Sequence, residues 1–241
     1  MNMRSLFFFC ALALLPAPVL ATELRNAPTA VIELFTSQGC SSCPPADALL
    51  AEMGGRDDVI ALAYHVDYWD YIGWRDTFGS PAYSEYQRAY AAARGEARIY
   101  TPQLVVNGGE EFVGSRRAEV VSAIAGTDLP VPLALSENNG MLAVSAGGNN
   151  AYPSARLWLV TFRSSASVTV ERGENRDRVL DYSHIVTSRQ IIGMWDRDNG
   201  VSVTLPVADL LGSQSDGAAI LIQEDLGGRP GRILGGTSFL Q

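Results

Sequence analysis

A Cys-x-x-Cys pair at the junction of an apolar run and a helix constrains this sequence more than any other feature. Residues 30–35 form an apolar run that predicts a buried strand, and Cys40 and Cys43 stand where the next helix should begin. The two prolines after Cys43 suit the first turn of a helix, where backbone N–H groups lack an intrahelical partner. Leucine and methionine at helical spacing predict that this helix covers residues 46–53.

This position favours thiol chemistry. The positive end of a helix dipole stabilises a thiolate, which makes a cysteine there a better nucleophile at neutral pH. We therefore predict a redox pair in which Cys40 attacks a partner disulfide and Cys43 resolves the mixed disulfide. The alternative interpretation is an inert disulfide.

The start of the chain has the features of a signal peptide. Arg4 precedes an apolar run over residues 6–15, and small residues lead to a predicted cleavage after Ala21. The run is shorter than the roughly 20 residues that cross a bilayer. We expect a periplasmic protein with no membrane association after signal removal, in which Cys40 and Cys43 remain once Cys10 is lost.

Length and charge narrow the function classes. The 241 residues carry a net charge of −8 with no basic stripe, so nucleic acid is not an expected partner. The length suits one large domain or two small ones. Protein thiols or disulfides are the predicted partners, and no cofactor or metal is predicted.

The first half predicts a defined order of elements. A second apolar run at residues 59–66 should form a strand parallel to the first, because a helix connects them. A helix follows over residues 81–93. The Asn107-Gly108 turn then joins strands at residues 104–106 and 111–113 into a hairpin. With a last helix over residues 116–125, the order is β-α-β-α-β-β-α.

This arrangement resembles the thioredoxin fold over residues 29–126. Cys40 and Cys43 match the redox pair of that family, and Thr101-Pro102 matches the residues that carry its cis-proline bond. The resemblance implies that Thr101 offers its backbone to an extended substrate segment. It also implies that Pro102 packs against the disulfide and discourages metal capture.

Two runs carry a narrower resemblance. Residues 33–47 and 65–70 are similar to a bacterial exported thioredoxin-like family that is catalogued only as a domain of unknown function. The sequence departs from thioredoxins at Gly39, where an aromatic residue is usual, and at Ser41-Ser42, where Gly-Pro is usual. Because the intervening dipeptide influences the redox potential in that family, oxidation, reduction and isomerisation all stay open.

The second half has a different pattern. Residues 129–132 suggest a linker, and short β-like runs separated by turn residues follow. Their spacing predicts an antiparallel β-sandwich. We therefore expect a thioredoxin-like βαβ-α-ββα domain at residues 22–127 and a β-rich domain at residues 128–241. The predicted strands cover residues 131–136, 141–145, 155–162, 167–170, 179–186, 201–205 and 218–223.

Three ionisable residues are candidates for proton transfer. His65 and Asp67 lie at the end of the second strand, at the edge of a parallel sheet where functional residues gather. Glu33 interrupts the first strand, and burial would raise the pKa of its carboxyl group. The alternative for each is a structural role.

An aromatic stretch follows the second strand. Tyr68, Trp69 and Trp74 are candidates for lining a groove that binds a partner peptide. The alternative is that they cover the core beneath a long loop.

The function that these features predict is an exported thiol–disulfide oxidoreductase. Two alternatives stay open. Soft thiolates favour copper(I), so a copper carrier with His65 as a third ligand is one, although Pro102 beside the sulfurs argues against it. The other is a binding module with an inert cysteine pair.

Overall fold

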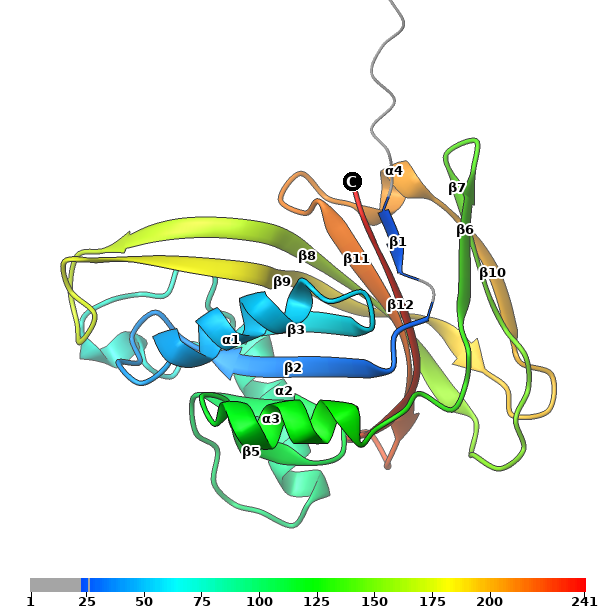
Figure 1. The fold of residues 1–241 in the computed structure, drawn as a ribbon, viewed down its shortest axis with the longest axis horizontal. Helices are drawn as coiled ribbons and strands as arrows, with labels where there is room; N and C mark the ends of the chain where they lie inside the picture. Colours follow the sequence, from blue (N-terminus) through cyan, green and yellow to red (C-terminus); the bar gives the residue numbers. More distant parts are fainter. Residues whose placement is uncertain (1–22, 26) are drawn as a thin grey trace, which may run out of the picture.

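A large mixed sheet dominates the protein (Figure 1). The computed structural model describes residues 23–25 and 27–241, so the predicted signal peptide, residues 1–21, lies outside the described residues. Within the described part, nine strands form one sheet in the order β1-β12-β11-β8-β9-β3-β2-β4-β5. A second sheet has the order β10-β7-β6. None of the helices in this part of the chain is long and apolar enough to cross a membrane.

The first half follows the predicted order of elements. Its members are β1 (Glu23–Arg25), β2 (Ala30–Thr36), α1 (Pro44–Gly54), β3 (Val59–His65), the 3-10 helix η1 (Asp70–Ile72), α2 (Pro81–Ala93), β4 (Gln103–Val106), β5 (Glu111–Val113) and α3 (Arg117–Ala125). Strand β2 pairs parallel with β3 and antiparallel with β4, and β4 pairs antiparallel with β5.

Successive side chains of β2 point to opposite faces of the sheet, and each face is covered by different helices. All seven residues of β2 are buried. Ile32 and Leu34 share an apolar cluster with residues of α1 and α3, whereas Val31 and Phe35 share another with tyrosines of α2. Because both faces of β2 are covered, its sequence is apolar at almost every position.

Local signals explain where the turns and helices start. Ser80 caps α2, with its Oγ accepting a hydrogen bond from the N–H of Ala82 at 3.3 Å. Asn107 and Gly108 have φ angles of 45° and 66°, the positive values that the two central residues of a type I′ turn need. A Cβ at Gly108 would lie 2.3 Å from the carbonyl oxygen of Gly231, so only glycine fits there.

The second half does not form a separate β-sandwich. Its elements are β6 (Ala134–Asn138), β7 (Met141–Ala146), β8 (Ala155–Val170), β9 (Arg178–Trp195), β10 (Val201–Pro206), α4 (Val207–Leu210), β11 (Gly217–Asp225) and β12 (Pro230–Leu240). Strands β8, β9, β11 and β12 continue the sheet of the first half. The predicted boundary at residue 128 therefore does not separate two sheets.

The junction between the halves is a pairing that no local signal reveals. Strand β9 lies beside β3 and pairs with it in parallel at Ala63 and Ile185. Two predicted strands, at residues 155–162 and 167–170, are parts of the single long strand β8. The small sheet packs on one face of the large sheet. Between them lies a second apolar core, formed by Val144, Leu157, Trp195 and neighbouring residues.

Candidate active site

The cysteine pair forms a disulfide between β2 and α1. The two sulfur atoms are 2.20 Å apart and the Cα atoms 5.4 Å apart. Cys43 directly precedes the first residue of α1, and its carbonyl oxygen accepts hydrogen bonds from the N–H groups of Ala46 and Asp47 at 2.8 and 3.1 Å. Cys40 is 1% exposed and Cys43 0%, whereas Ser41 and Ser42 between them are exposed.

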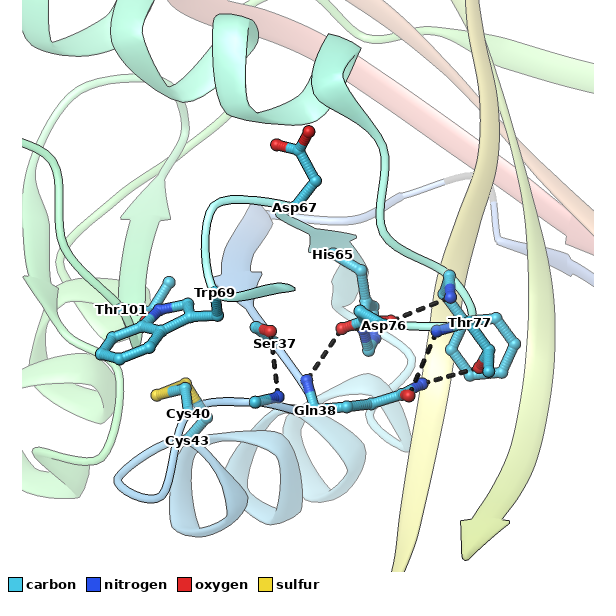
Figure 2. Close-up of polar contacts among 12 residues, drawn as sticks. Ser37, Gln38, Cys40, Cys43, His65, Asp67, Trp69, Asp76, Thr77 and Thr101 are labelled. Atoms are coloured by element: carbon cyan, nitrogen blue, oxygen red, sulfur yellow. Dashed lines mark hydrogen bonds and ion pairs between the residues drawn. A yellow bond between two sulfur atoms is a disulfide. The ribbon is translucent and has the colours of Figure 1, made fainter. Parts of the chain in front are cut away.

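Trp69 and Thr101 lie on the same side of the site as the sulfurs, as Figure 2 shows. Trp69 Nε1 donates to Thr101 Oγ1 at 2.7 Å, and the Thr101–Pro102 peptide bond is cis. A Cβ at Gly39 would lie 3.0 Å from Cβ of Trp69. A larger residue at position 39 would therefore crowd Trp69. This is the position at which thioredoxins usually have an aromatic residue.

The other two aromatic candidates differ in their surroundings. Tyr68 packs against the cluster of tyrosines beneath α2, and burial raises the pKa of its hydroxyl to about 12. Trp74 donates from Nε1 to Gln38 Oε1 at 2.9 Å and packs on the β8–β9 hairpin. Tyr68 lies beside Trp69, with ring centroids 6.3 Å apart, and a hydrogen bond with Thr101 opposes the rise in its pKa. Trp74 packs against the β8–β9 hairpin instead.

His65 forms a buried ion pair with Asp76. His65 Nδ1 lies 2.9 Å from Asp76 Oδ2, and both side chains have no exposed surface. Burial alone would lower the pKa of His65, but the charge and hydrogen bond of Asp76 raise it. Burial alone would raise the pKa of Asp76, but His65 and the N–H groups of Gln38 and Phe78 lower it.

Asp47 is a buried acid that the sequence prediction missed. It lies one turn after Cys43 in α1, where its N–H donates to the carbonyl oxygen of Cys43 at 3.1 Å. Its carboxyl group is buried and its two oxygens have no hydrogen bond of ordinary geometry. Burial raises the pKa of Asp47 to about 7, against smaller opposing effects of His65 and Thr36.

The carboxyl groups of Asp67 and Glu33 form hydrogen bonds with side chains of α2. The hydroxyl group of Ser84 donates to Asp67 Oδ1 at 2.5 Å, and Figure 2 shows this carboxylate pointing away from the sulfurs. Glu33 accepts hydrogen bonds from Tyr86 at 3.0 Å and Tyr90 at 2.5 Å. Burial raises the pKa of Glu33, and the hydrogen bond from Tyr90 opposes that effect.

Replacement of Glu33 by glutamine tests whether this carboxylate takes part in exchange. We expect a rate of disulfide exchange within about twofold of wild type. The free energy of unfolding should fall by about 1–3 kcal/mol, because the hydrogen bonds from Tyr86 and Tyr90, at about 0.5–1.5 kcal/mol each, are weakened. Stopped-flow exchange and urea unfolding measure the two quantities. A changed pH profile of the exchange rate would contradict this structural role.

The tip of the β8–β9 hairpin contacts the cysteine turn, residues 37–43, although the two are far apart in the sequence. Asn175 Nδ2 donates to the carbonyl oxygens of Gln38 and Cys40, each at 2.9 Å. Glu174 accepts a hydrogen bond from the N–H of Ser41 at 3.2 Å. No local signal marks these residues, because the contact spans 135 positions between Asn175 and Cys40.

The copper-carrier interpretation required His65 as a ligand beside the sulfurs. Its Nδ1 is directed at Asp76 (Figure 2), and its Nε2 is buried without a hydrogen-bond partner. Among residues 23–25 and 27–241, no group of three or more His, Cys, Asp or Glu side chains is arranged to hold a metal ion.

Comparison with known proteins places the chain in a family. A crystal structure of a protein from Agrobacterium tumefaciens is 34% identical in sequence, with a TM-score of 0.78. The match covers 89% of this chain and 94% of that one. No curated protein matches. Residues 31–223 match the family described as Protein of unknown function (DUF1223), and the chain therefore belongs to that family.

Proposed function

We propose that this protein is an exported thiol–disulfide oxidoreductase that acts on protein thiols or disulfides through Cys40 and Cys43. One observation carries the proposal: the Cys40–Cys43 disulfide stands at the first turn of α1, on the same side as Trp69 and the cis Thr101–Pro102 bond. A helix N-terminus stabilises the thiolate that such chemistry needs.

We also propose a thioredoxin-like arrangement for the first half. The strand order β3-β2-β4-β5 supports it, with β4 and β5 antiparallel. The clusters that bring α1 and α3 to one face and α2 to the other support it as well. The predicted signal peptide at residues 1–21 is the basis for proposing export to the periplasm.

The proposed reaction exchanges one disulfide for another. The Cys40 thiolate attacks a sulfur of the partner disulfide, an S–S bond forms between them, and the partner's second sulfur leaves as a thiolate. Cys43 then loses its proton and attacks Cys40, which releases the partner's first sulfur as a thiolate. Two electrons pass from the cysteine pair to the partner, and the reverse sequence oxidises a partner dithiol.

Asp47 is our proposed proton acceptor for Cys43. It follows Cys43 by one helical turn, its carboxyl oxygens are buried, and its pKa is raised to about 7. A group with a pKa near the working pH is the most effective general base. The His65–Asp76 pair beside it affects the charge of Asp47 without contacting the reacting sulfurs.

The test is exchange with a model protein disulfide. Reduced wild-type protein should reduce it and the Cys40→Ser variant should not, with thiols counted by alkylation and mass. The Cys43→Ser variant should accumulate a mixed disulfide through Cys40, because no second thiol resolves it. Undiminished exchange by Cys40→Ser, or no exchange by wild type, would reject the oxidoreductase function.

A further inference from the structure

The outer part of the β8–β9 hairpin is a ribbon of two strands that extends beyond the sheet (Figure 1). Strand β11 pairs with β8 only as far as Phe162, and β3 pairs with β9 only at Ile185. Residues 165–170 and 178–183 therefore pair with each other and with no further strand of the described chain. Two-stranded ribbons gain little stability from their own pairing.

Backbone irregularities separate this ribbon from the sheet. His184 has a φ of 51° at the inner end of the ribbon, and the register shifts between Thr161 and Phe162. Asp177 has a φ of 65° beside the turn. Such positions interrupt regular pairing. His184 and the register shift lie at the inner end of the ribbon, where it can change direction relative to the sheet.

The tip of the ribbon, residues 171–177, is polar and mostly exposed. Asn175 is the exception, with 0% of its surface exposed among neighbours that are largely in solvent. Its amide nitrogen donates to two carbonyl oxygens of the cysteine turn, and Arg178 Nη1 donates to its Oδ1 at 2.7 Å. Residues 171–177 are held to the turn by hydrogen bonds, whereas the ribbon behind them packs through Val170 and Leu180 on Trp74.

Cys40 and Cys43, in the turn that this contact joins, have almost no exposed surface. Disulfide exchange requires the attacking sulfur, the central sulfur and the leaving sulfur to approach a line, which needs open space beside Cys40. With Cys40 1% exposed, a partner protein cannot reach that position until a neighbouring segment leaves. The tip is the neighbour from the second half of the chain that binds the turn directly.

We propose that Asn175 latches the tip onto the cysteine turn, and that release of the tip opens Cys40 to its partner. This inference rests on the proposed function, because it assigns a gate to the same cysteines. Asn175 is a positioning residue in this role, since it binds the carbonyl groups of the turn and not the sulfurs.

The rate at which excess dithiothreitol reduces the disulfide tests the latch without a protein partner. A hydrogen bond contributes a factor of about five to an equilibrium constant, so loss of both amide bonds in Asn175→Ala should raise the rate about 25-fold. Arg176→Ala is the matched control, because this exposed side chain of the same tip contacts Asp177 and not the turn. Its rate should equal that of wild type.

The dependence of the reduction rate on urea separates a latch from a general loss of stability. Opening of the tip exposes little surface, so low urea concentrations should barely change the rate of Asn175→Ala; reduction through global unfolding would rise steeply. Should Asn175→Ala fail to fold, Glu174→Ala removes the exposed hydrogen bond to Ser41 and should show a smaller increase.

Two results would overturn the latch. One is an unchanged reduction rate in the variant. The other is an increase that rises with urea as steeply as global unfolding does. A faster reduction of Asn175→Ala in a protein that exchanges with no protein disulfide would support the latch and reject the proposed function, so the two proposals fail separately.

Discussion

Replacement of Asp76 by alanine is expected to lower the free energy of unfolding by about 3–5 kcal/mol, the usual cost of removing one partner from a buried ion pair. Asp76 is 3% exposed and His65 is fully buried. The Asp76 carboxylate also accepts hydrogen bonds from the N–H groups of Gln38 and Phe78, each at 2.8 Å. The variant leaves the buried His65 ring and two buried N–H donors without their acceptor.

The pH dependence of this loss follows from the two shifted pKa values. The pKa of His65 is raised, so its stabilisation is complete below 6.5 and is lost as the pH rises through the folded pKa. The pKa of Asp76 is lowered, so its stabilisation is complete above 3.8 and is lost as the pH falls through the folded pKa. The difference between wild type and variant should therefore be largest between those two ordinary pKa values.

Urea unfolding between pH 4 and pH 8 measures the effect, with Asp58→Ala as the control. Asp58 pairs with Arg56 at 2.7 Å on the surface, where the side chains are 42% and 37% exposed. An exposed pair of this kind contributes less than about 1 kcal/mol. Equal losses in the two variants would contradict the stabilising role of the His65–Asp76 pair.

Replacement of Asp47 by asparagine is expected to stabilise the protein at neutral pH. The folded pKa of about 7 lies above the ordinary value of 3.8, so the folded protein binds a proton over that interval that the unfolded chain has lost. Stability consequently falls as the pH rises from 3.8 to about 7, by at most about 4 kcal/mol at 1.4 kcal/mol per pH unit. Asparagine removes this fall, and urea unfolding from pH 5 to pH 8 should show a flatter profile.

The same substitution is expected to slow disulfide exchange at pH 7 by about a hundredfold, the contribution of a positioned general base. The difference should narrow at higher pH, where hydroxide removes the proton of Cys43 without help. A variant with greater stability and the wild-type exchange rate would contradict the role of Asp47 as proton acceptor. Glu33→Gln provides the matched comparison, because it also neutralises a buried carboxyl group, one on β2 that binds tyrosines of α2.

The sequence predicts elements well where the determining signals are local. The apolar run before Cys40, the prolines after Cys43 and the Asn107-Gly108 turn each act within a few residues, and the structure has the strand, helix and hairpin there. The helix α2 covers the predicted residues 81–93 because Ser80 and Pro81 mark its start.

The sequence does not reveal contacts that depend on distant pairing. The predicted boundary at residue 128 does not separate two sheets, because β9 joins β3 across more than a hundred residues of chain. Strand β12 was missed because Gly235 and Gly236 weaken its alternating pattern. They are needed for close approach, since a Cβ at Gly235 would lie 2.4 Å from the carbonyl oxygen of Val131.

The candidate site divides in the same way. Cys40, Cys43 and Thr101 follow from motifs, whereas Asp47 is one acid among many in the sequence and acquires its raised pKa only from burial. Asp76 and Asn175 likewise gain their roles from partners at residues 65 and 40. Asp67 was placed near the sulfurs by its position after β3, but the hydroxyl of Ser84 binds it on the side of α2.

The shared sheet also limits how this protein can have evolved. A recombination event that moved residues 22–127 into another gene would leave β3 as an open edge, and all seven residues of β3 are buried in the intact protein. Exposed apolar edges of this kind pair with other chains and aggregate. The segment that carries the cysteine motif therefore depends on the strands that cover β3, and we expect the two to be inherited together.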